Sequence, residues 1–351
     1  SVFSAIDDDL LMIRKFVREG ERITGTETKF KDVPYVLARL VRGLDGKVLQ
    51  FLSPGLKPFD GKGQFLEEQR SLGSILRDVG TRRSDFEAYL VAKRAQDLHK
   101  QEIKTGITGS DADAVVKLME ERHNDFPALQ KEIVGWNRAL LQYAQDKGFL
   151  SADQVKKMTE NGDNYVPFFR VIDELIVKGN ARKKFADVAN PFKKIKGSTR
   201  QIISPIESMT KNAYVIMSAV DRNRVGQAMV RLAASHPDLG RYIEEIPAGA
   251  KPITLNVDDV LKKLGIEEPS DTGQETVTLF VHGSKPNVAG ENIMMVVNDG
   301  KPSYYSVDPM LYKAVTAMSE ENASMVIRML SAPASLLRAG ATLTPEFIGR
   351  N

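Results

Sequence analysis

Apolar residues recur at every third or fourth position over most of this chain, the spacing that places side chains on one face of an α-helix. In one clear example, Ile133, Trp136, Leu140 and Tyr143 follow this spacing. Before residue 163 the pattern predicts a series of helices, over residues 5–20, 33–52, 64–79, 83–103, 108–123, 126–147 and from 151 onward.

Two helix starts carry residues typical of N-caps. Ser110 is the expected cap of the helix that follows it, because acidic residues occupy the first turn. Ser204 is the expected cap of the strongest helix, since Pro205 takes the first helical position and Glu207 the third. The apolar face of this long helix is expected to comprise Met209, Ala213, Ile216 and Val220.

The pattern changes between residues 251 and 307. The runs "ITLNV", "TVTLFVHG", "NIMMVV" and "SYYSV" are short and rich in β-branched or aromatic residues, which predicts strands. The sequence "NDGK" at 298–301 predicts a tight hairpin turn between two of them. Helical spacing resumes at Asp308, so the strands are expected to form a small insertion that begins and ends at turn residues.

These patterns predict a mainly α protein, an elongated multi-helix module with a small antiparallel β insertion at about 251–307. Five parts are expected. They are a helical array (1–162), an aromatic and basic crossover loop (163–203), a long central helix with its following turn (204–250), a β meander (251–307) and C-terminal helices (308–351).

Composition indicates a folded protein and limits its chemistry. Of 351 residues, 42% are hydrophobic and 27% are charged, which suits a chain with a substantial core. The absence of cysteine rules out disulfides and thiolate ligands, and no apolar run is long enough to predict a membrane-spanning helix. The chain begins at Ser and ends at "FIGRN", so we expect it to be a piece of a longer protein.

No arrangement of residues predicts catalysis. The four histidines are scattered, and although His99 and Glu102 share a helix face, no third ligand lies near them in sequence. No glycine-rich nucleotide loop and no nucleophile elbow is present. We therefore expect no catalytic residue, no cofactor and no metal site. An enzyme with an unrecognised site stays as a weaker alternative, and a cleft with clustered ionisable groups would favour it.

The stretch "DNYVPFFR" at 163–170 interrupts the helical pattern. Pro167 opposes a helix, and Tyr165, Phe168 and Phe169 lie within five residues of one another. Aromatic residues beside a proline commonly fix a loop onto a core, so burial is the favoured interpretation. A binding surface is the alternative.

A basic segment follows between residues 178 and 200. It contains only one acidic residue, Asp187, and Phe185 and Phe192 lie among its cations. Such a segment is usually a solvated loop, but it is also a candidate for contact with nucleic acid or another polyanion. Because the net charge of the chain is only +3, polyanion binding is predicted from the charge of this segment and not from the charge of the whole chain. The candidate polyanion-binding residues are Lys178, Arg182, Lys183, Lys184, Lys193, Lys194, Lys196 and Arg200.

Several motifs, in order, resemble those of a known family. They are "NYVPFFRV", "IKGSTRQIISPIESMTKNAYVIMSAVDRNRV", a β hairpin, "YYSVDPMLYKAV" and "LLRAGATLTPEFIGRN". Together they resemble the helical modules of large phage polyvalent proteins, the large polyvalent protein-associated domains, over about residues 33–351. None of these motifs is a catalytic signature, so the resemblance carries over no catalytic residue.

The resemblance implies a non-catalytic scaffold module of a bacteriophage virion protein. It would act in DNA ejection or in the inner core, as an internal virion protein delivered into the host cell. Its expected partners are other parts of the same large chain or other virion proteins, and a homo-oligomer is a further candidate. The main alternative is a nucleic-acid-binding module that contacts the phage genome through residues 178–200. Salt-dependent binding to DNA would favour that alternative.

Overall fold

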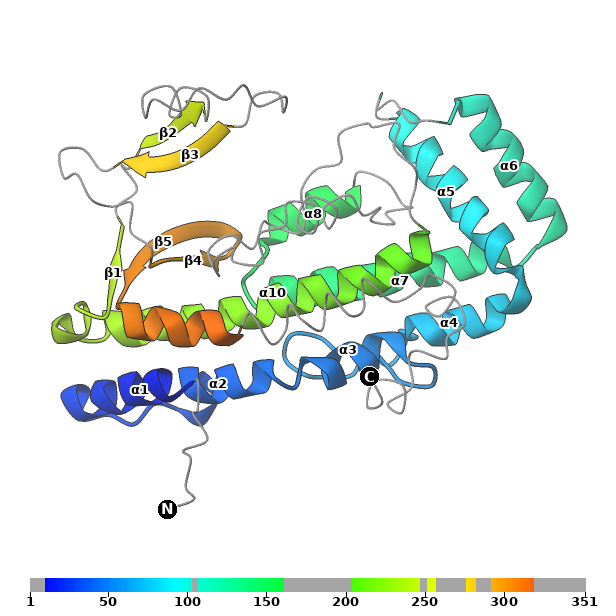
Figure 1. The fold of residues 1–351 in the computed structure, drawn as a ribbon. Helices are drawn as coiled ribbons and strands as arrows, with labels where there is room; N and C mark the ends of the chain where they lie inside the picture. The colour runs from blue at the N-terminus through cyan, green and yellow to red at the C-terminus, as the bar shows by residue number, and fades with distance from the viewer. Residues whose placement is uncertain are drawn as a thin grey trace, which may run out of the picture.

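The structure is a computed structural model, which describes residues 10–100, 102, 107–160, 204–246, 251–256, 276–281 and 292–318 (Figure 1). Helices make up most of these residues, as the hydrophobic spacing predicts. They are α1 (Leu11–Thr24), α2 (Pro34–Val41), α3 (Leu44–Leu52), α4 (Leu72–Val79), α5 (Arg83–Lys100), α6 (Gly109–Arg122), α7 (Phe126–Asp146), α8 (Ala152–Glu160) and α10 (Pro205–Ala234), with short 3-10 turns at Phe30–Asp32, Gly80–Arg82 and Pro237–Leu239.

The helix starts confirm one predicted cap and correct the other. The Ser204 hydroxyl accepts a hydrogen bond from the Glu207 N–H at 3.3 Å, so α10 begins where the sequence indicates. The helix α6 is capped by Thr108, whose hydroxyl accepts from the Asp111 N–H at 3.2 Å. The prediction of Ser110 as this cap was therefore wrong. Either residue type can cap a helix, and sequence alone does not fix the first turn to within two residues.

The helix α10 lies at the centre of the described structure. Figure 1 shows α1, α2 and α3 along one side of it, α7 and α8 on another, and strands β4 and β5 against its C-terminal half. Side chains outside the expected face, such as Tyr214 and Met217, are as buried as Met209 and Ala213 on that face. The prediction of a single apolar face is therefore corrected. Other elements cover α10 around its circumference, as expected of a core helix.

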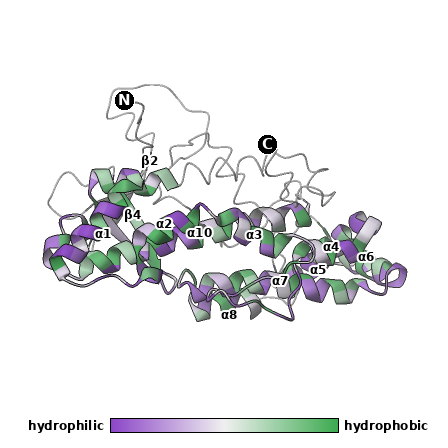
Figure 2. Cartoon of the chain, turned by 90° about the horizontal axis from the view of Figure 1, so that it is seen from below, coloured by the Kyte–Doolittle hydropathy of each residue, from purple (hydrophilic) through white to green (hydrophobic). Residues whose placement is uncertain are grey.

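Two hydrophobic clusters share α10. The first cluster comprises residues of the five helices from α3 through α7 and of the first half of α10, and it contains Trp136, Phe86 and Tyr143. The second cluster joins α1, α2, the sheet and the helical residues 309–318 with the second half of α10. Figure 2 shows hydrophobic and hydrophilic residues interleaved along helices that extend in the direction of α10. The result is an elongated arrangement with one helix common to both cores.

The β insertion contains two separate antiparallel sheets. One sheet has the strand order β1 (Ile243–Glu245), β5 (Lys301–Val307), β4 (Ile293–Asn298). The other sheet pairs β2 (Lys251–Asn256) with β3 (Thr276–Val281). The hairpin turn predicted at 298–301 is confirmed, because Asn298 pairs with Lys301 around a turn of left-handed residues. Strand β1 precedes the predicted range and was missed, since three residues are too few to show alternation.

The β4–β5 hairpin is held directly by α10. Strand β4 is at the edge of its sheet, and the Asn223 side chain forms hydrogen bonds with backbone groups of that edge. Its Nδ2 donates to the Val297 carbonyl at 2.8 Å, and its Oδ1 accepts from the Val297 N–H at 2.7 Å. Gly226 allows the close approach, because a Cβ there would lie 3.0 Å from Val296. The hairpin therefore packs on α10 with Met294 and Val296 in the second cluster and Val297 in the first.

Candidate functional site

The predicted polyanion-binding cations, from Lys178 to Arg200, lie outside the described residues. So do Tyr165, Phe168 and Phe169 of the aromatic stretch. Both sets therefore stay as predictions.

Within the described residues, a group of ionisable side chains lies where α3 and α7 pack on α10. We call this group the junction cluster: Lys47 of α3, Tyr143 of α7, Lys147 directly after α7, and Asp221 and Arg224 of α10. Residues 221 and 224 are three apart and lie on one side of α10, while Lys147 follows Tyr143 by four positions, just after the end of α7. The sequence shows these spacings, but only the packing of the three helices brings the pairs together.

Asp221 is the buried anion of the junction cluster, with only 5% of the residue exposed. Its carboxylate accepts a hydrogen bond from the Tyr143 hydroxyl and forms an ion pair with the Lys47 ammonium. Burial raises the pKa of Tyr143, and the nearby Asp221 charge raises it further. The Tyr143 hydroxyl thus keeps its proton and donates a hydrogen bond, and each oxygen of the buried carboxylate has a partner.

Among the described residues, the surroundings of Lys147, unlike those of Asp221, provide no partner of opposite charge in direct contact. Its ammonium lies 5.8 Å from the centroid of the Tyr143 ring, and it has no hydrogen-bond or ion-pair partner in the part of the chain that the structure describes. Burial lowers the pKa of Lys147 to about 8, and the nearby Arg224 and Lys47 charges contribute to the decrease. The Asp221 and Asp146 charges oppose it without overcoming it.

Arg224 has no carboxylate partner in the described ranges. Its Nη2 donates to the Lys31 carbonyl at 3.3 Å. The nearby Asp146 is held elsewhere, because its carboxylate accepts from the Gly61 N–H at 3.0 Å and from the Gln142 amide at 2.6 Å. The junction cluster therefore holds three cationic side chains and one carboxylate, Asp221.

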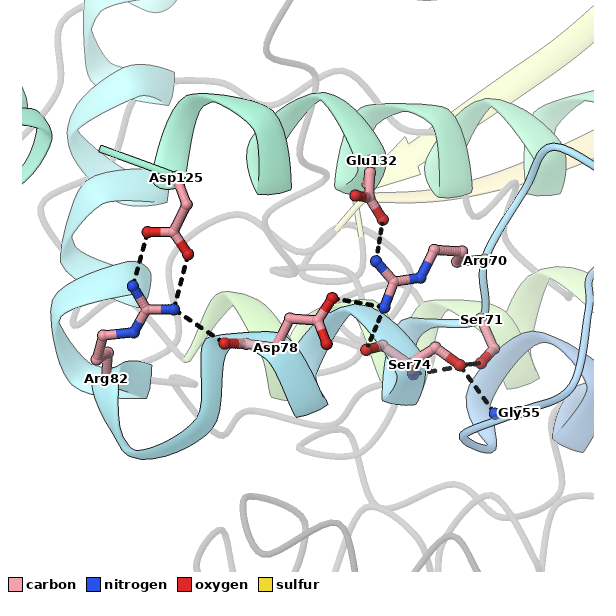
Figure 3. Close-up of polar contacts among 8 residues, drawn as sticks. All are labelled: Gly55, Arg70, Ser71, Ser74, Asp78, Arg82, Asp125 and Glu132. Carbon is pink, nitrogen blue, oxygen red and sulfur yellow. Dashed lines mark hydrogen bonds and ion pairs between the residues drawn. The ribbon is translucent and has the colours of Figure 1, made fainter. Parts of the chain in front are cut away.

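A second polar network joins α4 and the residues flanking it to α7 (Figure 3). Arg70 bonds to Glu132 at 2.9 Å and to Asp78 at 2.7 Å, while Arg82 forms a bidentate pair with Asp125 at 2.6 and 2.8 Å. Every charge in this network has a partner and most are substantially exposed. The network is therefore suited to fixing helix positions, with modest stabilisation from each pair.

The histidines in the described residues do not form a metal site, because no group of three or more suitable ligands occurs there. His123, for example, bonds to Asp85 at 2.8 Å and packs against Phe126 with tilted rings whose centroids are 4.4 Å apart. None of the helices in the described ranges is long and apolar enough to span a membrane.

Comparison of the chain with protein-family models, with curated proteins and with solved structures found no significant match.

Proposed function

We propose that this chain is a non-catalytic scaffold module of a large phage polyvalent protein. In this role it would be packaged in the virion and would support DNA ejection or the inner core. The resemblance in the sequence motivates the proposal, and the way the motif residues are used in the fold supports it.

The supporting observation is that polar residues of the motif "SPIESMTKNAYVIMSAVDRNRV" bind other parts of the same chain. Ser204 caps α10, Asp221 pairs with Lys47 and Tyr143, and Asn223 binds the edge of β4. Residues that serve catalysis are expected to face a cleft with unpaired reactive groups. Asp221 and Asn223 are instead buried and paired, which is the pattern expected of a structural element.

The motif "YYSVDPMLYKAV" supports the same interpretation. Its first residues form β5, with Tyr305 opposite both Met294 and Glu245 in the sheet. Asp308 then accepts hydrogen bonds from the Met310 and Leu311 N–H groups at 2.9 and 3.1 Å, so it caps the next helix. The motif residues thus define where a strand ends and a helix starts.

The test is to purify particles of the phage that encodes this chain and to search them for its peptides by mass spectrometry. The proposal expects peptides from residues 10–160 and 204–318 at a constant ratio to a known capsid protein. A lysate of infected cells is the control for expression. Peptides that occur in the lysate but not in the particles would contradict a virion role.

A second candidate function is contact with nucleic acid through the basic segment, and its support is the charge density of residues 178–200. Binding to DNA should weaken steeply as salt rises. Replacing Lys193, Lys194 and Lys196 together by Gln should reduce that salt dependence. Weak DNA binding that the triple change does not alter would instead favour contacts with acidic protein surfaces, and loss of incorporation into particles would then be expected.

A further inference from the structure

The outer face of α2 carries large apolar side chains that are exposed to water. This helix lies along one side of α10 (Figure 1), and its other face is buried in the second cluster. Phe30, in the 3-10 turn before α2, is 77% exposed, and Leu40 in the helix is 51% exposed. Val33 and Val36 between them are partly exposed. Single exposed apolar residues are common, whereas several that adjoin one another are typical of a contact surface.

Backbone geometry aligns these four side chains in one row. The Val33 N–H donates to the Phe30 carbonyl at 3.4 Å, and this bond across three residues brings the two side chains to the same side of the 3-10 turn. Val33 is also the N-cap of α2, a position whose side chain lies over the first turn of the helix, which contains Val36. Leu40 follows Val36 by four positions, so it lies on the same side one turn later.

Cationic side chains surround this apolar row. Residues 29–42 contain four of them, all exposed, and one carboxylate, Asp32. The Asp32 carboxylate lies 4.0 Å from the Arg231 guanidinium, so α10 compensates its charge. The next acidic residues in sequence, Glu27 and Asp45, lie beyond the two ends of the row. We call the row of four apolar residues, together with Lys29, Lys31, Arg39 and Arg42, the α2 patch.

From this geometry we propose that the α2 patch binds the surface of a membrane that contains anionic lipids. Apolar side chains along one side of a surface helix, bordered by Lys and Arg, are the combination that binds at the interface between lipid and water. Phe30 and Leu40 would enter the boundary between headgroups and acyl chains, while the cations would attract the lipid phosphates. The chain would lie on the membrane without crossing it. This inference goes beyond the proposed scaffold role and does not depend on it.

A single strand of nucleic acid is the other anionic partner to consider. It would also attract the cations, and a base could stack on the Phe30 ring. Val33, Val36 and Leu40, however, have no aromatic face on which a base could stack. Acyl chains can contact the whole apolar row, whereas bases would use only one of its four residues. The α2 patch therefore fits a lipid surface better than a nucleic acid.

The primary test is flotation of the full chain with lipid vesicles. Vesicles of phosphatidylcholine and phosphatidylglycerol in equal amounts provide the anionic surface, and phosphatidylcholine alone is the reference. The anionic vesicles are expected to bind at least about tenfold more tightly, and their binding should weaken as salt rises. Because residues 178–200 are also basic, every chain in this test carries the Lys193, Lys194 and Lys196 changes to Gln.

Two truncations test the apolar row. Phe30→Ala is expected to weaken binding to the anionic vesicles by about tenfold, and Leu40→Ala by about fivefold, because each removes apolar area that would enter the lipid. The matched controls are Phe65→Ala and Leu118→Ala, since these side chains are 56% and 46% exposed and lie outside the α2 patch. Both controls should bind like the parent chain. All four side chains are at the surface, so all four variants are expected to unfold like the parent chain.

Replacing Lys29 and Lys31 together by Gln tests the charges separately. This change is expected to weaken binding to the anionic vesicles by about tenfold. Binding to phosphatidylcholine alone should not change, because no lipid charge is then available to attract the cations.

A fluorescent side chain tests insertion directly. Trp136 is the only tryptophan of the chain and is fully buried, so Phe30→Trp adds a second emitter at the α2 patch. On anionic vesicles its emission is expected to shift to shorter wavelength and to be quenched by lipids with brominated acyl chains. Phe65→Trp is the matched control, and its added emission should be unaffected by the same vesicles.

Three results would overturn the proposal. The first is that the parent chain binds anionic vesicles no better than phosphatidylcholine alone. The second is that Phe30→Ala and Leu40→Ala bind the anionic vesicles as tightly as their matched controls, or that brominated lipids leave the Phe30→Trp emission unchanged. The third is that a short single-stranded oligonucleotide binds, that Phe30→Ala weakens this binding, and that the vesicles do not bind. This last result would assign the α2 patch to nucleic acid instead of lipid.

Discussion

At the scale of single residues, the Tyr143 hydroxyl offers the cleanest test of the buried polar contacts. Tyr143→Phe removes only the hydrogen bond to Asp221 and keeps the ring in the first core. Because the acceptor is a buried charge, the free energy of unfolding is expected to fall by about 1.5–3 kcal/mol. Urea unfolding followed by circular dichroism measures the change.

Tyr89→Phe is the matched control for that experiment. The Tyr89 hydroxyl donates to Glu120 at 2.7 Å, but the Glu120 side chain is 40% exposed, so water can replace the lost donor. We expect this control to change the free energy of unfolding by less than about 1 kcal/mol. Equal losses from the two changes would show that the burial of Asp221 adds nothing to its contact with Tyr143.

The lowered pKa of Lys147 predicts that the stability of the protein depends on pH, and it determines the direction of this dependence. In the unfolded chain its pKa is near 10.5, and in the folded chain it is about 8, so the unfolded state binds more protons between these values. Stability therefore rises with pH across this window, because the folded state then holds Lys147 in its neutral form and no longer buries a charged ammonium.

Lys147→Met keeps much of the side-chain volume and removes the charge. We expect it to raise the free energy of unfolding near pH 7 by roughly 0.5–1 kcal/mol, after allowance for solvent screening of a half-exposed group. The gain should disappear above about pH 10.5, where both states of the unmodified chain carry a neutral Lys147. Guanidinium unfolding at several pH values measures both effects, and a gain independent of pH would point to packing instead of charge.

At the scale of elements, the edge of β4 depends on one side chain of α10. Asn223→Ala removes both hydrogen bonds to Val297, and Gln227 still binds the carbonyl at 2.8 Å but leaves the N–H without its partner. The expected loss of stability is about 1–3 kcal/mol, the cost of a buried unsatisfied donor. Hydrogen exchange gives a local measurement, because the Val297 amide should exchange faster than its neighbours in β4.

Gln227→Ala is the matched control at this edge. It removes a bond to the same carbonyl, but Asn223 continues to bind both groups of Val297. We expect protection of the Val297 amide to be retained. If both changes expose the amide equally, the two side chains act through the general packing of α10 rather than through separate hydrogen bonds.

An element or site can be predicted from the sequence when the residues that define it are close together in the chain. The spacing of Ile133, Trp136 and Leu140 is local, and it predicts α7 correctly because a helix repeats within a few residues. The junction cluster depends on contacts between residues 174 and 78 positions apart, and no local pattern contains that information. The burial of Tyr214 likewise depends on which elements cover α10.

At the scale of the whole molecule, the shared helix α10 predicts that the two hydrophobic clusters unfold together. Each cluster has its own set of neighbouring elements, and α10 contributes side chains to both. Loss of one cluster would expose a long part of α10 to water and remove support from the other half. A single cooperative transition is therefore expected, as for one compact unit.

The chain supplies its own probe for this prediction, because Trp136 is the only tryptophan and is fully buried in the first cluster. Met294→Ala opens a cavity in the second cluster and should lower the free energy of unfolding by about 2–5 kcal/mol. With one cooperative unit, the Trp136 fluorescence transition shifts by the same amount as the circular dichroism transition. The matched change in the first cluster, Met209→Ala, should shift both signals together as well. If Met294→Ala leaves the Trp136 transition in place while part of the helical signal is lost early, the two clusters are independent and α10 does not couple them.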